Sequence, residues 1–86
     1  MDFMHSEVET GSDDAIEVSL DGNAANVMVM DSSNFSSYRR GGRFHYYGGH
    51  YTRSPAVIRP PSSGNWHVVI DLGGGRGRVQ ASVRVI

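Results

Sequence analysis

Short segments in which apolar and polar residues alternate recur about every ten residues along this 86-residue chain. The clearest segments are residues 16–20, 66–71 and 79–85. Alternation of period two is typical of a strand with one buried face, and no stretch keeps the apolar period of an amphipathic helix over two turns. We therefore expect an all-β fold: a small jelly-roll-like sandwich or barrel of about six to eight short antiparallel strands, with no long helix.

Three further segments have the composition of strands: Ala24 to Met30, Arg43 to Tyr47 and Ala56 to Arg59. In the second of them, Phe44 and Tyr46 would share one face. The third should stop where two prolines follow it, because proline cannot donate to a β-ladder.

Glycines mark the expected turns. Asp21 and Gly22 have the composition of a tight hairpin turn, which would join the segment before them to the one after. The run from Gly73 to Gly77 is expected to be a flexible hairpin between two strands. A phosphate cradle is the weaker interpretation of this run, because a cradle needs a helix N-terminus behind it and a strand follows here.

The chain is long enough for one small domain, residues 1–86, whose net stability would be about 4 to 13 kcal/mol. It has no cysteine, so a packed core or self-association must supply the stability, and a homo-oligomer is one expectation. Removal of Val85 and Ile86 should be costly, because the chain ends inside its last strand. The expected core consists of Ile16, Val18, Leu20, Val27, Trp66, Val68, Ile70, Val79 and Val83.

Charge is sorted along the chain. Eight of the nine acidic residues lie at or before position 31, and all eight basic residues are arginines at or after position 39. The arginines could pair with acids across the sheets, each exposed pair contributing about 0 to 1 kcal/mol. Alternatively, opposite charges on separate faces could drive association, or the arginines could be presented to a partner.

No targeting segment is evident. The N-terminus carries acids where a secretory signal needs Lys or Arg, and no apolar run is long enough to span a bilayer. We expect a cytoplasmic protein that does not contact a membrane.

Several strings in the chain are specific in combination: a Met-x-Phe-x-His start, an Ala-Asn-Val strand, Met-Asp-x-x-Asn-Phe-x-x-Tyr, Tyr-Tyr-Gly-Gly and Trp-His-Val-Val-x-Asp. In these strings the sequence resembles, over nearly its whole length, the bacterial family catalogued as domain of unknown function 1883. The resemblance implies a compact β-sandwich or barrel, found alone or beside signalling domains of the TIR type. It carries no catalytic residue over to this chain.

The segment from Tyr38 to Arg53 interleaves arginines with tyrosines, a composition suited to contacts with phosphate and to stacking on bases. A nucleic-acid interface is the alternative hypothesis, although the isoelectric point of 6.4 is low for one. Four or five phosphate contacts would give a log–log salt slope near −4. The contact residues expected from this segment are Arg39, Arg40, Arg43, Tyr46, Tyr47, Tyr51 and Arg53.

A second interpretation of the same region is a site for a small ligand such as a sugar or a nucleotide, formed where the central loop folds over one end of the sandwich. Its residues would be Asp31, Asn34, Tyr38, His45, Tyr47 and Arg53. The simpler interpretation, which we favour, is that Asp31 and Asn34 cap a turn that Phe35 anchors.

Catalytic and metal chemistry find little support in the sequence. His45 and His50 are five residues apart, which would put them on opposite faces of a strand, and no Cys is present, so we expect no metal site. His67 is expected to be a surface or hydrogen-bonded residue. No nucleophile elbow is present and no triad can be assigned, so we expect no enzymatic activity and no cofactor.

These observations favour a non-enzymatic binding or interaction module that recognises a small or anionic ligand or associates with itself. Nucleic acid is the less favoured partner.

Overall fold

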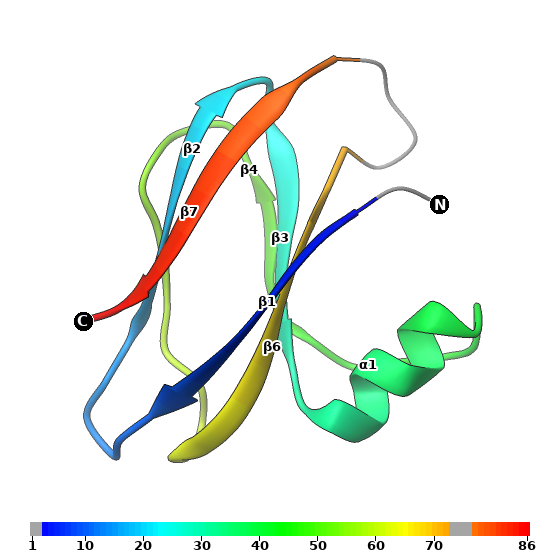
Figure 1. The fold of residues 1–86 in the computed structure, drawn as a ribbon, viewed down its shortest axis with the longest axis vertical. Helices are drawn as coiled ribbons and strands as arrows, with labels where there is room; N and C mark the ends of the chain where they lie inside the picture. The colour runs from blue at the N-terminus through cyan, green and yellow to red at the C-terminus, as the bar shows by residue number, and fades with distance from the viewer. Residues whose placement is uncertain (1–2, 73–76) are drawn as a thin grey trace.

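The computed structural model describes residues 3–72 and 77–86, which form one short helix and seven strands (Figure 1). The elements are β1 (Met4–Thr10), β2 (Ile16–Gly22), β3 (Ala25–Met30), α1 (Ser32–Arg39), β4 (Tyr47–Tyr51), β5 (Ala56–Ile58), β6 (Gly64–Asp71) and β7 (Val79–Val85). All pairs of neighbouring strands are antiparallel. The expected all-β fold without a long helix is confirmed.

The strands form two sheets that pack face to face. The first sheet has the order β1-β6-β3-β4, and the second has the order β5-β2-β7. Helix α1 packs on the face of the first sheet that the second sheet leaves open, as Figure 1 shows at its lower right. The four-stranded sheet is therefore the middle of three layers.

The main core lies between the two sheets. Ile16, Val18, Val27, Val68 and Ile70 are at most 3% exposed, and Trp66 packs with them. Three residues that we expected in the core, Leu20, Val79 and Val83, are only half-buried, the last two because β7 is an edge strand.

Strand β6 is buried on both faces, which its alternating pattern did not predict. Its apolar face, with Trp66 and Val68, looks toward the second sheet. The alternation of residues 66–71 would leave His67, Val69 and Asp71 on the opposite, unburied face, but they are at most 9% exposed because α1 covers them. His67 is thus a hydrogen-bonded residue and not a surface residue.

Helix α1 begins after Asp31, whose side-chain Oδ1 accepts a hydrogen bond from the Asn34 N–H at 2.8 Å. This is an N-cap, which supplies an acceptor to one of the N–H groups that a first helical turn leaves without a partner. Phe35 and Tyr38 point from the helix onto the first sheet and form a second core cluster there. The cap expected from the sequence is confirmed, but it begins a helix of eight residues where the sequence predicted only a turn.

The hairpin predicted at Asp21 and Gly22 is wrong. Asp21 and Gly22 are the last residues of β2 and pair with Gln80 and Val79 of β7, and β3, which follows them, lies in the other sheet, so the chain crosses between the sheets after Gly22. Gly22 does adopt the positive φ that the sequence predicted, +113°, and a Cβ there would lie 2.5 Å from the Arg78 carbonyl oxygen. The other predicted hairpin, at Gly73 to Gly77, would join β6 to β7, which also lie in different sheets; residues 73–76 of this run are outside the described residues.

The strand predicted at Arg43 to Tyr47 lies further along the chain than expected: β4 begins only at Tyr47. Before it, the Asn34 side-chain oxygen accepts the His45 N–H at 2.7 Å, and the Phe44 ring packs edge-on against Tyr38 at 5.1 Å. These contacts bind the segment to α1 and keep its backbone out of the ladder.

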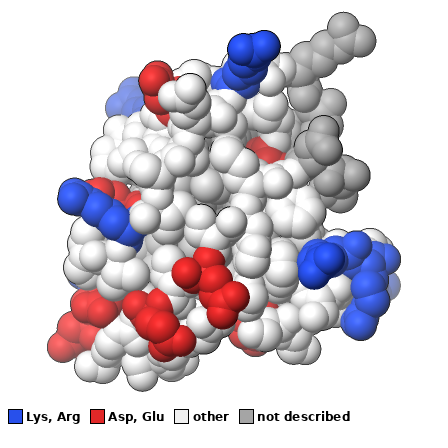
Figure 2. Space-filling view, in the orientation of Figure 1, with Lys and Arg blue, Asp and Glu red and all other residues white. Residues whose placement is uncertain are grey.

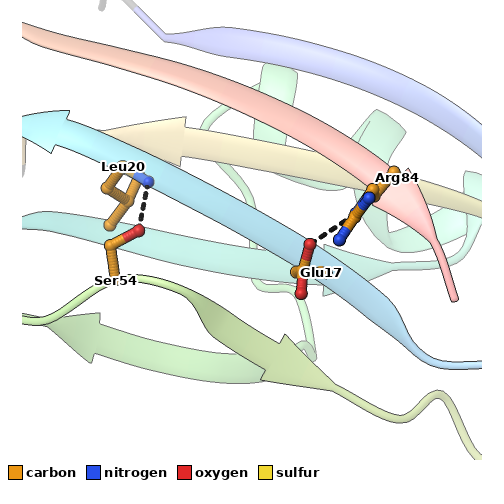
Figure 3. Close-up of polar contacts among 4 residues, drawn as sticks. All are labelled: Glu17, Leu20, Ser54 and Arg84. Carbon is orange, nitrogen blue, oxygen red and sulfur yellow. Dashed lines mark hydrogen bonds and ion pairs between the residues drawn. The ribbon is translucent and has the colours of Figure 1, made fainter.

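The second sheet shows one of the charge pairs expected across strands (Figure 3). Arg84 Nε on β7 donates to Glu17 Oε1 on β2 at 2.5 Å, and their side chains are 72% and 16% exposed. A pair so exposed contributes about 0 to 1 kcal/mol. On the other side of β2, the Leu20 N–H donates to Ser54 Oγ at 2.8 Å, which ties the loop after β4 to this sheet.

Candidate functional site

Three arginines gather where α1 ends; we call Arg39, Arg40 and Arg43 the arginine corner. Arg39 is the last helical residue and Arg40 caps the helix. The chain then turns at Gly41, whose φ of +78° favours glycine, and the Gly42 N–H donates to the Ser37 carbonyl at 2.8 Å. This turn exposes all three arginines on one short stretch of chain.

A hollow of about 160 Å³ adjoins the arginine corner, lined by Phe3, Tyr38, Arg39 and Gly41. The Arg39 guanidinium carbon lies 5.8 Å from the centre of the Phe35 ring, within the range of a cation–π contact. A Cβ at Gly41 would meet no atom within 4 Å, so this side of the corner is open to a ligand.

The sorting of charge along the chain persists in space. Figure 2 shows basic groups gathered over the end of α1, and acidic groups concentrated at the opposite lower corner of the same face. Within residues 3–72 and 77–86, Arg84 is the one arginine that forms an ion pair. The arginine corner is therefore presented to solvent and not neutralised by the acids described in the structure.

The structure does not bring all the site residues predicted from the sequence together. Asp31, Asn34 and His45 are joined by hydrogen bonds around the start of α1, and the arginine corner lies at its end. Tyr47 and Tyr51 lie on the other side of the first sheet, where Tyr47 packs edge-on against Trp66 at 6.1 Å. Three predicted site residues remain. Tyr38 is buried, Tyr46 is 45% exposed and lies beside Phe44, and Arg53 is exposed in the loop after β4.

Tyr38 belongs to a polar network beneath the helix. Its hydroxyl donates to Asp71 Oδ2 at 2.9 Å, and the Asn26 side-chain amide donates to Asp71 Oδ1 at 2.9 Å. His50 Nδ1 in turn lies 3.1 Å from Asn26 Oδ1. Burial and the neighbouring Asp71 carboxylate raise the pKa of Tyr38 well above its usual value, so the phenol stays protonated.

A second polar network, a row formed by Ser32, His67 and His5, lies near the start of α1. Ser32 Oγ is 2.9 Å from His67 Nε2, and His67 Nδ1 is 2.8 Å from His5 Nε2. The Phe35 ring lies nearly parallel to both imidazoles, with centroids 4.1 Å from His5 and 4.7 Å from His67. His5 is exposed as a residue, but its ring is partly shielded from water where it stacks on Phe35; this desolvation and the adjacent His67 lower the pKa of His5, Arg39 adds to the effect, and Glu7 opposes it.

Sequence reasoning missed both of these networks. His5 and His67 are 62 residues apart, and only the antiparallel register of β1 and β6 brings them together. One signal was present in the sequence: His67 and Asp71 stand in a strand that is otherwise apolar from Trp66 to Ile70. Polar residues in such a strand are typical of buried, hydrogen-bonded positions once both faces are covered.

Among residues 3–72 and 77–86, no group of three or more His, Cys, Asp or Glu side chains is arranged to hold a metal ion. No helix in that part of the chain is both long and apolar enough to cross a membrane.

A comparison with protein-family models matches residues 1–86 to the domain of unknown function 1883 (DUF1883). The chain belongs to the DUF1883 family. The match spans the whole DUF1883 domain described above, including the arginine corner and both polar networks. Comparisons with curated proteins and with solved structures find no match.

Proposed function

We propose that this DUF1883 domain is a binding module whose arginine corner takes an anionic group. The observation that supports the proposal most directly is the distribution of charge: three exposed arginines project from one turn, and the acids of the same face lie at its other end (Figure 2). The proposal places the module in the bacterial cytoplasm, in keeping with a cysteine-free chain and with the family resemblance.

The chemistry of the corner favours phosphate or carboxylate. A guanidinium group offers planar, paired N–H donors that fit two oxygens of such an anion at once. The Phe35 ring beside Arg39 restrains this side chain, which reduces the entropy that binding would otherwise cost. The adjoining hollow of about 160 Å³ would accommodate a small group next to the anion.

A purely structural role is the main alternative. Cations near a helix C-terminus interact favourably with the helix dipole, by about 0.3 to 1 kcal/mol each. That role requires the residues at the helix end, Arg39 and Arg40, but it does not require Arg43 or the open face at Gly41. Binding, in contrast, should depend on all three arginines.

Nucleic acid is less well supported as a partner by this geometry. Base stacking needs exposed aromatic rings along the basic groove. Here Tyr38 is buried and Tyr51 is half-buried, and Tyr47 lies on the side of the first sheet away from α1. Self-association is also compatible with the charge distribution, because the basic corner of one copy could face the acidic corner of another.

The test is a thermal-shift titration with pyrophosphate, ADP and citrate, since a ligand that binds only the folded state raises the melting temperature. We expect pyrophosphate or ADP to stabilise the wild-type protein and to have no effect on the triple variant Arg39→Gln, Arg40→Gln and Arg43→Gln. The matched control removes the same charge elsewhere, at Arg53, Arg59 and Arg78, and should keep the response.

Two further arms separate the alternatives. If all three anions leave both proteins unchanged, or if the control loses the response as well, the arginine corner is not a binding site. A labelled single-stranded DNA that bound with a log–log salt slope of about −2, as expected for three phosphate contacts, would favour the nucleic-acid hypothesis. Sedimentation at low and high salt would reveal association through opposite charges.

A further inference from the structure

The row Ser32–His67–His5 has the arrangement of a base-activated nucleophile. A hydroxyl lies 2.9 Å from one imidazole nitrogen, and the other nitrogen of that ring is held at 2.8 Å by a third side chain. Both distances lie within the range of hydrogen bonds between a nucleophile, its base and the group that orients the base. The three residues come from three separate elements, α1, β6 and β1.

The three residues of the row differ in their exposure to solvent. His67, the central ring, is 7% exposed, whereas Ser32 and His5 are exposed. The base is therefore shielded from water while the hydroxyl can be reached by a substrate. Phe35 lies against both imidazoles and fixes the planes of the rings, with interplanar angles of 13° and 11°.

The charges around the row favour the productive tautomer. His67 can accept the Ser32 proton at Nε2 only if its Nδ1 carries hydrogen and donates to His5, so His5 must be neutral. The lowered pKa of His5 has this effect at neutral pH. The other ionisable groups near the row are Glu7 on β1 and Arg39 on α1, which act on His5 in opposite directions, and Asp31, the N-cap next to Ser32.

Ser32 also lies in the first turn of α1, where a helix leaves N–H groups without intrahelical acceptors. The Asp31 side chain accepts one of these groups, that of Asn34, and the first regular helical bond runs from the Phe35 N–H to the Asp31 carbonyl. The N–H groups of Ser32 and Ser33 remain at the positive end of the helix dipole, where they can stabilise negative charge that develops beside Ser32 Oγ.

A structural explanation exists for the same contacts. A buried histidine requires a partner for each ring nitrogen, and Ser32 and His5 supply these partners whether or not the serine reacts. All buried side-chain polar atoms in the described part of the chain have such partners. The two explanations differ in one measurable property, which is the reactivity of the Ser32 hydroxyl.

We propose that Ser32 is a nucleophile activated by His67 and that it accepts the acyl group of a small activated ester, such as an aryl ester or a thioester. The Ser32 Oγ–carbon bond forms as the proton passes to His67 Nε2; the bond to the leaving group then breaks, and His67 returns the proton to the departing oxygen or sulfur. Water then attacks the acyl carbon and gives a proton to His67 Nε2; the bond from that carbon to Ser32 Oγ breaks, and His67 returns the proton to Ser32 Oγ as the acid leaves. His5 is a positioning residue, because it acts through His67.

This inference goes beyond the anion-binding function, which concerns the other end of α1, and it departs from the expectation drawn from the sequence that no triad can be assigned. The hollow lined by Phe3, Tyr38, Arg39 and Gly41 lies at that other end. The substrate is therefore expected to be a small group that approaches the exposed Ser32 from solvent.

The experiment uses a fluorophosphonate probe, which forms a bond from phosphorus to serine oxygen and releases fluoride, with the labelled serine located by mass spectrometry. We expect label on Ser32 and none in Ser32→Ala. The matched control is Ser33→Ala: Ser33 is an exposed serine in the same helical turn, whereas the serine bonded to His67 is Ser32, so this variant should label like the wild type.

Substitution of the base separates activation from simple exposure. His67→Gln should lower the labelling rate about 100-fold, which is the smaller end of the usual contribution of general-base catalysis. Because His67 is buried, its replacement also disturbs packing, so His5→Gln supplies an independent measurement: it should shift the pH dependence of labelling while Ser32 remains the labelled residue.

The proposal is overturned if Ser32 reacts no faster than Ser33, or if labelling of the folded His67→Gln protein matches the wild type. It is also overturned if His5→Gln leaves the pH profile unchanged. None of these outcomes bears on the arginine corner, whose test uses different residues and different probes.

Discussion

Replacement of Gly48 by alanine should destabilise the protein strongly. Gly48 is the second residue of β4 and has a φ of +129°, a conformation that L side chains rarely adopt. A Cβ built on it would lie 2.1 Å from the Val27 carbonyl oxygen, where an ordinary contact is 3.4 Å or more. Val27 is fully buried in the centre of the first sheet, so its backbone has little room to retreat.

The magnitude follows from two contributions. A residue held in a disfavoured backbone conformation costs about 1 to 3 kcal/mol, and overpacking against a rigid neighbour costs about 1 to 3 kcal/mol more. The expected loss is therefore about 2 to 6 kcal/mol, out of a total stability of about 4 to 13 kcal/mol for a chain of this length. The melting temperature should fall by roughly 8 °C or more.

Urea unfolding, followed by the fluorescence of Trp66, would measure this loss. Gly49→Ala is the matched control, because a Cβ at Gly49 would meet no atom within 4 Å and its φ is not positive. The control should be as stable as the wild type, or slightly more stable through a less flexible unfolded chain. If Gly48→Ala unfolds within about 0.5 kcal/mol of Gly49→Ala, the backbone geometry inferred for β4 is wrong.

Three other measurements address the helix side of the first sheet and the C-terminus. Tyr38→Phe removes the hydroxyl that donates to buried Asp71 and should lower the free energy of unfolding by about 1 to 3 kcal/mol in urea titrations, whereas the exposed Tyr46→Phe should have almost no effect. Because the pKa of His5 is lower in the folded protein, its contribution to stability is present above the unfolded value of 6.5 and is lost as the pH falls through the folded pKa. The free energy of unfolding should thus decline below pH 6.5, and an equally steep decline in His5→Gln would contradict this assignment. Deletion of residues 85–86 removes two backbone hydrogen bonds between Ile86 and Ala15, of 3.0 and 2.9 Å, and the pairing of β7 at its end; an unchanged melting temperature would show that this pairing is dispensable.

Much of the strand content could be predicted from the sequence because it depends on local pattern. The segments that contain Ile16 and Val18, Ala56 and Ile58, and Trp66 and Ile70 all became strands, and their apolar residues became the main core. The positive φ at Gly22 and the cap at Asp31 were likewise predicted, because each depends on a few neighbouring residues.

The pairing of the strands could not be predicted in the same way. The positive φ of Gly22 would serve equally well in a hairpin turn or at the end of a strand after which the chain crosses to the other sheet. Which of the two forms depends on the strands with which β2 and β3 pair. Strand β2 pairs with β5 and β7, and β3 pairs with β4 and β6, none of which is predicted by the residues around Gly22.

The two candidate sites differ in the same way: one could be predicted from the sequence and the other could not. The arginines at 39, 40 and 43 could be identified from composition, because charges close in sequence stay close in space. The row from Ser32 through His67 to His5 could not, because its members are brought together by the register of β1 on β6 and by the docking of α1 on the first sheet.

The sequence by itself determined that this chain forms short strands, that Asp31 is a cap and that its charges are separated, because these properties arise from residues within a few positions of one another. Only the tertiary structure decided that α1 would cover the second face of β6. Burial of that face turns His67 and Asp71 from surface residues into the centres of two hydrogen-bonded networks. The physical reason is that a polar side chain shielded from water must find its partners within the protein, and those partners come from the elements that pack over it.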